Sequence, residues 1–361
     1  MSVKIIYKNL LFQHRKSTII KHYKNELEGI IQKKGEKLKP ISDEYRNKIK
    51  EFYRRFGIKS VDTSWHEFIY SVTGKEDVRY IPEDLYHYFI EPVYTHGDNS
   101  LENKSFMELI LPPPLVAFPR NVIYCMDSIL FDSNRNTISE RQALQIISNY
   151  KELIIKPSVV TGSGRGVQII DNTLNDLSEF GDNFVIQERI IQDDNHSKFN
   201  TTSVNTEKII SMVEGNEVSI LTSILRVGAP GSITDTASKG DGFSVGILPD
   251  GKLNSIGYTL TGDKVSADFS GRLLEKCSSP EHEEIIEIIK KCHIQIPYFK
   301  IISWDFAISN EHKPILIEYN LNYPDVLIYQ LSNGPLFAEK TEEKLEECKE
   351  LNKKRKSYLF T

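Results

Sequence analysis

The sequence predicts an α+β fold preceded by a helical N-terminal region, and three observations support this prediction. Residues 300–320 place two runs of β-branched and aromatic residues on either side of a short polar turn, which is typical of a β-hairpin. Residues 208–227 repeat that pattern around Gly215-Asn216. Residues 285–292 instead repeat apolar side chains at helical spacing. A chain of 361 residues with 39% hydrophobic and 26% charged residues is long enough for two or three globular domains.

The first hundred residues are predicted to be helical. Residues 1–56 place Tyr, Ile and Phe between charged runs, and residues 1–60 carry 16 Lys/Arg against 6 Asp/Glu. Residues 57–100 are rich in aromatic side chains, which are more often core than binding surface. We therefore expect these side chains to pack a small helical domain: Trp65, Phe68, Tyr70, Tyr80, Tyr86, Tyr88, Phe89 and Tyr94. The run of three prolines at 112–114 predicts a stiff connector.

Short strands and helices alternate along the rest of the chain. Ser139 followed by Gln142 is a capping box, which predicts a helix through Ile147. Ser279 as N-cap and Pro280 in the first turn predict the start of a second helix. Further strands are predicted at 152–157, 167–170, 184–187, 208–213 and 218–227, and a charged helix at 336–358.

The hairpin at 300–320 carries the strongest chemical signal. If its turn is 310–313, antiparallel pairing places Ser309 opposite Pro314 and Asp305 opposite Glu318, with Asn320 on the same face. Like charges directly opposite each other destabilise a sheet, and burying two unpaired carboxylates is costly. A divalent cation removes the conflict, because carboxylate and amide oxygens suit Mg²⁺ shared with a phosphate. The alternative is a solvated hairpin face whose acids point to water.

A glycine loop at 161–166 follows the strand that ends near Lys156. Glycines expose backbone N–H groups and allow close approach to an anion. The loop lacks the Gly-Lys-Ser/Thr of a P-loop, and a strand follows it where a dinucleotide fingerprint needs a helix. The strand–loop–strand order suggests a flap that covers phosphates. Lys156 is then either an edge charge in solvent or a phosphate ligand, and the adjacent loop favours the ligand.

Charge distribution and cysteine content bear on whether the protein is of a membrane, secreted, nucleic-acid-binding or cytoplasmic class. The net charge is −5, but residues 1–60 carry +10 and the remainder −15. The basic N-terminal region and the basic tail at 353–356 are read either as solvated helix faces or as contacts with an anionic membrane leaflet or an acidic glycan. No segment resembles a nucleic-acid-binding module. No apolar run has the length of a membrane span, no signal peptide is apparent, and the four scattered cysteines indicate a reducing cytoplasm.

These segments, taken in order, resemble the ATP-grasp superfamily. The resemblance rests on Ile-Ile-Lys-Pro at 154–157, the glycine loop, Val-Ile-Gln-Glu-Arg-Ile at 185–190 and the hairpin that contains Trp-Asp-Phe-Ala-Ile and Ile-Glu-Tyr-Asn. More narrowly, the chain is similar to the sugar-transfer-associated ATP-grasp proteins of bacterial surface-polysaccharide clusters, including teichuronopeptide-type members. That narrower match covers about residues 55–345 and rests on residues 80–85, 203–206, 224–228 and 330–337.

The resemblance implies an ATP-grasp fold of two α+β subdomains that clamp ATP. It implies a helical, basic region at 1–100, an N-terminal part with the flap at 101–190, a C-terminal subdomain with the metal hairpin at 191–335, and a terminal helix with a basic tail at 336–361. It also implies site residues. ATP would contact Lys104, Lys156, Gly162, Ser163, Gly164, Gly166, Gln187, Glu188 and Asp193, and two Mg²⁺ ions would be held by Asp305, Glu318 and Asn320. Arg226 would stabilise an acyl-phosphate and a tetrahedral intermediate. Lys208 stands where the family usually has arginine, which removes the bidentate fork and puts a carboxylate clamp there in doubt.

The function implied by the resemblance is that of an ATP-dependent carboxylate–amine ligase. It would join an amino-acid amine to a uronic-acid carboxylate on a polysaccharide or on a nucleotide- or lipid-linked sugar. Such an enzyme would act in the cytoplasm or at the inner face of the cell membrane. Two alternatives stay open: an ATP-grasp kinase of a sugar hydroxyl, and a non-catalytic nucleotide-binding component of a polysaccharide assembly. The sequence leaves the oligomeric state open.

Overall fold

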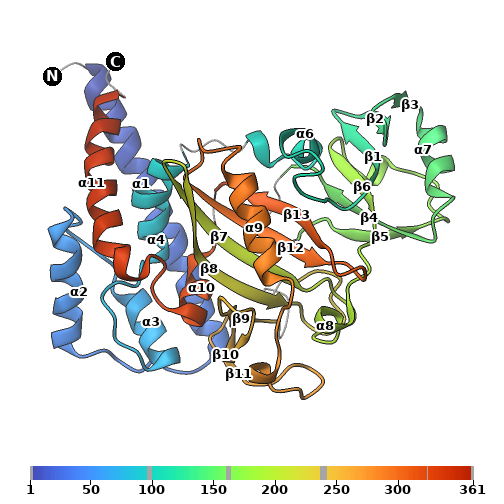
Figure 1. Cartoon of the computed structure of the whole chain (residues 1–361). Coiled ribbons are helices and arrows are strands. Elements are labelled where there is room, and N and C mark those ends of the chain that lie inside the picture. The colour runs from blue at the N-terminus through green and yellow to red at the C-terminus, as the bar shows by residue number, and fades with distance from the viewer. Residues whose placement is uncertain (1–2, 96–99, 160–163, 236–241, 323, 359–361) are drawn as a thin grey trace.

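The computed structural model describes residues 3–95, 100–159, 164–235, 242–322 and 324–358. Two antiparallel β-sheets form the body of this part of the chain, and a group of helices packs against the larger sheet. Figure 1 shows the smaller sheet at the end of the molecule opposite the helices. The predicted α+β architecture with a helical N-terminal region is confirmed. The domain boundaries at residues 100, 190 and 335 stay a prediction.

The N-terminal helices are α1 (Val3–Lys34), α2 (Asp43–Arg55) and α3 (Ser64–Thr73). Ser42 caps α2 by accepting a hydrogen bond from the backbone N–H of Tyr45, which satisfies one of the orphan donors of the first turn. Shorter turns of helix follow, namely α4 (Glu83–Leu85), η1 (Tyr86–Ile90), α5 (Glu91–Tyr94), η2 (Ser100–Glu102) and α6 (Met107–Ile110).

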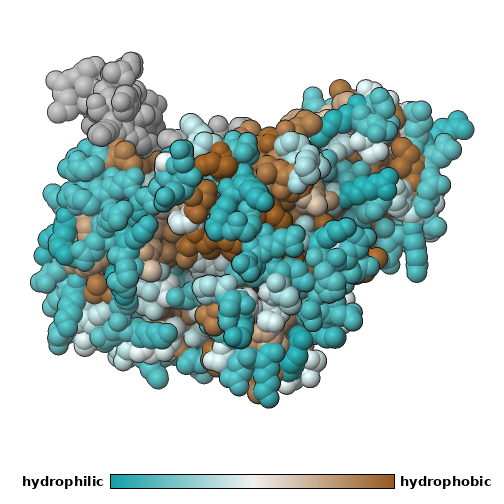
Figure 2. All heavy atoms as spheres, in the orientation of Figure 1, coloured by the Kyte–Doolittle hydropathy of each residue, from teal (hydrophilic) through white to brown (hydrophobic). Residues whose placement is uncertain are grey.

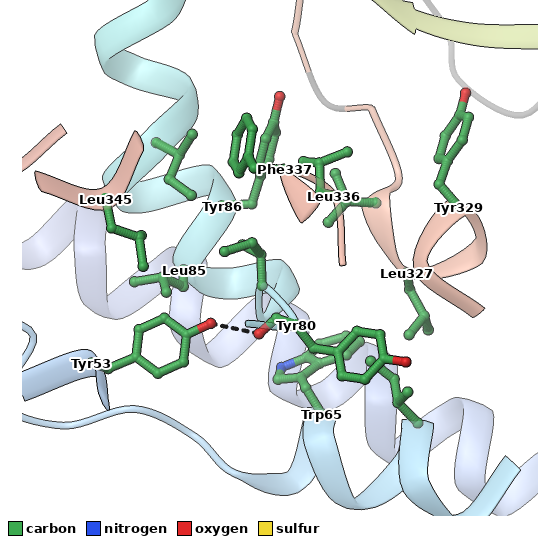
Figure 3. Packing of buried hydrophobic residues seen from close by; sticks show 14 of the residues in the cluster. Tyr53, Trp65, Tyr80, Leu85, Tyr86, Leu327, Tyr329, Leu336, Phe337 and Leu345 are labelled. Carbon is green, nitrogen blue, oxygen red and sulfur yellow. Dashed lines mark hydrogen bonds between the residues drawn. The ribbon is translucent and has the colours of Figure 1, made fainter. Parts of the chain in front are cut away.

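Helices α1 to α5 share one hydrophobic core with the C-terminal helices α10 (Val326–Asn333) and α11 (Thr341–Tyr358), which flank the 3₁₀ turn η5 (Ala338–Lys340). Figure 3 shows Trp65, Tyr80 and Leu85 from the N-terminal region packed beside Leu327 and Leu345 from the C-terminal one. Most of the aromatic side chains expected in this core are buried. Burial at about 25 cal/mol per Å² makes such a shared core the main force holding the two ends of the chain together.

Several basic side chains of the N-terminal region are occupied in contacts within the molecule. The ammonium of Lys34 lies 2.9 Å from Asp263, a guanidinium nitrogen of Arg46 lies 3.2 Å from Glu67, and a guanidinium nitrogen of Arg55 lies 3.0 Å from Glu342. Part of the basic charge therefore serves packing between helices and the sheet. No helix in the described ranges combines the length and apolar character that crossing a membrane requires.

The smaller sheet has six strands in the order β3-β2-β1-β6-β4-β5. Helix α7 (Glu140–Ile147) packs against it, and Ser139 and Gln142 form the predicted capping box at its start. The loop between β5 and β6 contains the 3₁₀ turn η3 (Ser178–Phe180). The strands are β1 (Asn121–Met126), β2 (Ile129–Asp132), β3 (Thr137–Ile138), β4 (Glu152–Pro157), β5 (Gln168–Asp171) and β6 (Phe184–Glu188).

The larger sheet has seven strands in the order β11-β10-β9-β8-β7-β12-β13. A linker that contains α8 (Asp194–Ser197) joins β6 to this sheet, and η4 (Leu274–Lys276) precedes α9 (His282–His293). The strands are β7 (Thr206–Glu214), β8 (Glu217–Val227), β9 (Phe243–Ile247), β10 (Leu253–Thr259), β11 (Lys264–Val265), β12 (Ile301–Ile308) and β13 (Pro314–Asn320).

The two faces of the larger sheet are covered by different helices. Successive residues of a strand point to opposite faces, so Ile209 packs with α9 while Ile210 packs in the core shared with α10. Figure 2 shows hydrophilic side chains on the outward surface of α9, in keeping with the apolar spacing that predicted an amphipathic helix.

Two sequence-based expectations are corrected by the structure. Helix α9 begins at His282 without a side-chain cap, and the hydroxyl of Ser279 donates a hydrogen bond to Glu207 instead of capping the helix. In the β12–β13 hairpin, Pro314 pairs with Ile308, so the expected pairing with Ser309 is wrong by one residue. A β-bulge between Asp305 and Phe306 shifts the register back, and Asp305 does lie opposite Glu318.

Candidate active site

A cavity of about 950 Å³ lies between the two sheets. Its walls include Lys156 and Gln187 from the smaller sheet, and Lys208 and Asp305 from the larger one. The end of β6 and part of the linker after it, residues 188–192, also line it. The cavity brings together most of the site residues expected from the sequence, namely Lys104, Lys156, Gly164, Gln187, Glu188, Lys208, Arg226, Asp305, Glu318 and Asn320.

Asp305 lies at the centre of the acidic pair. It sits between Lys208 on β7 and Glu318 on β13, each directly opposite it in the sheet register. The Lys208 ammonium donates a hydrogen bond to one carboxylate oxygen, Oδ2. Burial raises the pKa of Asp305 to about 6, and the attraction of Lys208 does not fully offset it. The other oxygen, Oδ1, is buried and accepts no hydrogen bond in the described part of the chain.

Glu318 is neutralised by a different lysine. The ammonium of Lys104 lies 2.8 Å from its Oε2 atom. Burial opposes the charge on Glu318, but Lys104, Lys156 and Lys208 outweigh burial and hold the pKa of this carboxyl down at about 2. The Lys104–Glu318 and Lys208–Asp305 pairs therefore relieve the carboxylate repulsion that the hairpin register implies.

Lys156 is a buried ammonium in the wall of the cavity. Its side chain lies on β4 and the residue is only 7% exposed. Burial, followed by repulsion from Lys104, lowers the pKa of Lys156 to about 8. Among the described residues, no hydrogen bond or ion pair to its ammonium is found. A buried charge is costly unless it is paired, so this position favours an anionic ligand.

Lys104 is held in place from two directions. Its backbone N–H donates to the carbonyl of Ser158, just after β4, at 2.8 Å. Two residues earlier, the carboxylate of Glu102 accepts the backbone N–H of Asn322 at 2.9 Å and that of Leu321. Burial raises the pKa of Glu102 to about 7. Sequence reasoning missed Glu102, because its partners lie beyond β13 and nothing near it in the sequence indicates them.

Arg226 enters the cavity from β8, opposite Thr206 of β7. Its Nε atom is buried and no acceptor for it occurs among the described residues. Burial opposes the charge of Lys208, but Asp305 outweighs it and keeps the pKa of this lysine above its ordinary value. The two cations are therefore in different states, since Lys208 is paired with a carboxylate while Arg226 retains an unused donor.

The residues expected to hold the nucleotide differ in how the structure positions them, and two of them lie outside the described residues. Gln187 is buried and its side-chain amide donates to Asn121 at 2.8 Å, while the backbone N–H of Glu188 donates to the carbonyl of Arg120 at 2.9 Å. The backbone of Gly166 has φ +81°, and a Cβ atom there would lie 2.8 Å from Pro157 Cγ, so glycine is required. Gly162 and Ser163 lie outside the described residues.

Asp193 is not brought to the cavity. It is the N-cap of α8, where its carboxylate accepts the backbone N–H groups of Asn195 and His196. It is absent from the cavity wall, and its position does not support the expected contact with ATP.

The donors at the hairpin fit Mg²⁺. Asp305, Glu318 and Asn320 offer carboxylate and amide oxygens to the same cavity, which are the hard ligands that this ion prefers. The Oδ1 atom of Asp305 is buried and has no partner in the described ranges, which indicates room for a further cation there. Lys104 contacts Oε2 of Glu318 and Lys208 contacts Oδ2 of Asp305, so each lysine would need to move if a metal ion took that oxygen.

Comparison with solved structures finds distant similarity to several enzymes. The biotin carboxylase domain of Hydrogenobacter thermophilus 2-oxoglutarate carboxylase, solved with MgADP, is 12% identical with a TM-score of 0.38, over 66% of this chain and 46% of that one. An L-amino acid ligase from Bacillus licheniformis is 13% identical with a TM-score of 0.36, over 68% and 48%. D-cycloserine synthetase is 14% identical with a TM-score of 0.38, over 68% and 70%.

This chain spans about half the length of the first two of these structures. A search of curated proteins gave no match. The sequence model of the sugar-transfer associated ATP-grasp family matches residues 164–345, half of the chain, from the segment before β5 to the first turn of α11, and includes the β12–β13 hairpin. The chain belongs to the sugar-transfer associated ATP-grasp family.

Proposed function

We propose that this protein is an ATP-dependent carboxylate–amine ligase. The observation that supports the proposal is the composition of the cavity: two carboxylates on paired strands, Asp305 and Glu318, lie in the same cavity as the buried Lys156, whose ammonium has no counter-ion among the described residues. Triphosphate and Mg²⁺ together satisfy this arrangement, because the phosphates match the cations and the metal matches the acids.

The residues have separate roles in nucleotide binding. Lys104 and Lys156 bind the phosphates, with Gly164 and Gly166 carrying the flap that covers them, while Gln187 and Glu188 begin the adenine-binding linker. Asp305, Glu318 and Asn320 hold two Mg²⁺ ions, which neutralise charge on the transferring phosphoryl group. L-amino acid ligase and a MgADP-bound carboxylase domain are among the similar structures, which is compatible with this assignment.

The chemistry needs positioned charges and no protein nucleophile. An oxygen of the acceptor carboxylate attacks the γ-phosphorus of ATP, the bond to the β,γ-bridging oxygen breaks, and ADP leaves. The amine then attacks the carbonyl carbon of the acyl-phosphate, phosphate leaves, and the amine loses a proton to solvent. Arg226, whose Nε has no acceptor among the described residues, stabilises the charge on the carbonyl oxygen during both steps. Lys208 orients Asp305 and supplies further positive charge.

The substrates proposed are an amino-acid amine and a uronic-acid carboxylate. The family description, which links these ATP-grasp proteins to sugar transfer, supports a sugar acceptor in capsule or other surface-polysaccharide synthesis. We place the reaction in the cytoplasm or at the inner face of the membrane, on a free, nucleotide-linked or lipid-linked sugar.

The test uses hydroxylamine as a general trap. Purified protein is incubated with Mg²⁺, ATP and a panel of uronic acids, and an acyl-phosphate is converted to a hydroxamate that mass spectrometry detects whatever the natural amine is. We expect hydroxamate and ADP only when the correct acid is present. Lys156→Met should abolish both, while Lys290→Met, on the exposed face of α9, should not change them.

The outcomes separate the candidate functions. Amino acids added in place of hydroxylamine should give an amide and stoichiometric phosphate. A phosphorylated sugar that resists hydroxylamine would instead identify a kinase of a sugar hydroxyl. ATP binding without turnover of any acid or sugar would favour a non-catalytic component of a polysaccharide assembly.

A further inference from the structure

A second group of metal-ligating side chains lies outside the cavity. It joins Asp193 in the linker after β6, Glu281 just before α9, and His312 in the turn between β12 and β13. One ligand atom of each residue lies within 4.8 Å of the others. We propose that these three side chains bind a divalent transition-metal ion, with Zn²⁺ as the ion that the donor set favours. This inference is independent of the proposed function.

Glu281 provides the observation that points to a ligand. The residue is only 8% exposed, and its Oε1 atom lies 3.0 Å from Nδ1 of His312. Its second oxygen, Oε2, is buried and has no hydrogen-bond partner within the described residues. An unsatisfied buried carboxylate oxygen is costly, and a bound cation would satisfy it.

Asp193 is a buried carboxylate that is fixed by hydrogen bonds, as metal-ligating carboxylates usually are. It is 2% exposed, and it accepts hydrogen bonds from the backbone N–H of Asn195 at 2.9 Å, and from the backbone N–H and Nδ1 of His196 at 3.3 Å and 2.7 Å. An ionised carboxylate has roughly four acceptor positions, so one remains for a further partner. The other ring nitrogen of His196 lies 3.0 Å from the hydroxyl of Ser279, which fixes the ring. Such outer contacts orient ligands at metal centres.

His312 provides the entry route and the selectivity. Its side chain is 62% exposed, so an ion can reach the group from solvent. The imidazole nitrogen favours Zn²⁺ over Mg²⁺, whereas the cavity offers oxygen donors from Asp305, Glu318 and Asn320. We therefore expect Mg²⁺ to bind in the cavity and Zn²⁺ to bind at the second site. Excess Mg²⁺ should leave the second site available to Zn²⁺.

Bound metal would tie three segments together. The linker that holds Asp193 also contributes residues 189–192 to the cavity wall, and the backbone N–H of Asn310 in the hairpin turn donates to the carbonyl of Ile191 of that linker at 2.8 Å. Glu281 adds the segment before α9. The ion would restrain the connection between the two sheets without contacting the nucleotide.

The test is a Zn²⁺ titration of the full chain by isothermal calorimetry, in excess Mg²⁺ and ATP so that the cavity is occupied. We expect one Zn²⁺ per chain, and a dissociation constant that His312→Gln and Glu281→Gln each raise by ~10- to 100-fold or more. His22→Gln is the matched control, because His22 is an exposed histidine on α1 that should leave binding unchanged. Co²⁺ should give a visible absorption spectrum in the wild type that His312→Gln removes.

Metal-free melting curves of each variant report whether folding is intact. His312 is exposed in a turn, so His312→Gln should melt with the wild type in the absence of metal and lose only the stabilisation by Zn²⁺. Stoichiometric Zn²⁺ binding that survives both His312→Gln and Glu281→Gln would overturn the proposal, as would the absence of stoichiometric binding in the wild type. Binding abolished by Glu318→Gln alone would assign the ion to the cavity and equally reject the second site.

Discussion

The ammonium of Lys104 lies 2.8 Å from the carboxylate of Glu318, the residue that lies directly opposite Asp305 in the β12–β13 hairpin. Asp305 in turn is paired with Lys208 on the opposite neighbouring strand. Each acid of the hairpin thus has its own lysine. The lysines balance the charge of both acids in the absence of metal, and under the proposed function nucleotide binding would exchange these lysine contacts for contacts with metal and phosphate.

Glu318→Gln should destabilise the ligand-free protein by roughly 1–3 kcal/mol, since a hydrogen bond to a charged partner is lost. The repulsion between Asp305 and Glu318 alone would predict a small gain, but Lys104 and Lys156 lose their shared counter-charge. Urea unfolding of Glu318→Gln, Lys104→Met and the double variant measures the coupling between the two residues, expected at about 0.5–3 kcal/mol. Additive effects, or a stabilised Glu318→Gln, would contradict the pairing.

Glu318→Gln should also lower turnover by ~10²-fold or more at saturating Mg²⁺, because charge stabilisation of the transferring group is a large term. Asp305→Asn should act in the same direction and additionally release Lys208. The measurement is acid-dependent ADP release, with Lys290→Met as the matched control on the exposed face of α9. Near-normal turnover of both variants would remove the metal-binding role from the hairpin.

The residue pattern correctly predicted that Asp305 pairs with Glu318. The hairpin nevertheless contains two irregularities whose effects on the register cancel. The turn closes with the N–H of Ser309 bonded to the carbonyl of Lys313, with His312 at φ +57°, which shifts the pairing by one residue. The bulge beside Asp305 then restores it. Neither irregularity follows from the residue pattern, because bulges depend on packing against the rest of the sheet.

Residues that position the site from a distance were not predictable. Glu102, Glu207 and Ser279 act on partners more than 70 residues away in the sequence. Glu207 illustrates the difficulty: it neighbours Lys208 on β7 but points to the opposite face, where His282 Nδ1 lies 2.6 Å from its carboxylate. The local elements, by contrast, carry their own signals, as the capping box of α7 shows.

Lys156 should make ATP affinity fall as pH rises above about 8, the value to which burial lowers its pKa from an ordinary 10.5. In the ligand-free protein, Lys156 affects the free energy of unfolding in the opposite direction. Below pH 8 the folded and unfolded states both carry the charge and its burial cost is present in full. Between pH 8 and 10.5 the unfolded state binds more protons, so the free energy of unfolding rises with pH.

Calorimetry in buffers of different ionisation enthalpy tests the role of Lys156 directly. At pH 8.5 ATP binding should take up a proton in the wild type and in Lys290→Met. Lys156→Met should bind ATP weakly and without that uptake, whereas Lys156→Arg, which stays charged, should keep its affinity at pH 9. Equal proton uptake in wild type and Lys156→Met would assign the titration to another group.

Glu83 should stabilise the α10 wall of the cavity. Its two carboxylate oxygens accept the backbone N–H groups of Val326 and Leu327, each at 2.9 Å, and α10 carries Ile328 and Tyr329 into the cavity wall. Glu83→Gln keeps only one acceptor, so a buried N–H is left unpaired. We expect a loss of roughly 1–3 kcal/mol in the free energy of unfolding.

Measuring the KM for each substrate distinguishes a role of Glu83 in positioning α10 from a role in core packing alone. Displacement of α10 should raise the KM for the acceptor more than that for ATP, because Lys104 and Lys156 lie on other elements. Leu345→Ala, in the same core but on α11, is the matched control that lowers stability without touching α10 capping. Equal changes of both KM values in the two variants would leave Glu83 as a packing residue only.

The basic surface of α2 should not guide the acceptor. Figure 1 places α2 at the end of the molecule opposite the smaller sheet, so the cavity between the sheets is remote from it. Arg55 pairs with Glu342 and its guanidinium lies 4.9 Å from the centre of the Phe52 ring, so reversing its charge would disturb packing. Arg54 and Lys59 are exposed and are the suitable positions for a charge reversal.

In Arg54→Glu/Lys59→Glu, the KM for a uronic-acid acceptor should therefore stay within ~2-fold of the wild type from 0.05 to about 0.5 M salt. The reason is that salt screens exposed charges. The Debye length is about 10 Å at 0.1 M salt, so exposed charges on α2 affect only groups close to them. Arg226→Lys, inside the cavity, is the contrasting variant and should raise the acceptor KM at every salt concentration. An acceptor KM that climbs with salt in the wild type, and is already high at low salt in the double variant, would show that the N-terminal region does attract an acidic glycan.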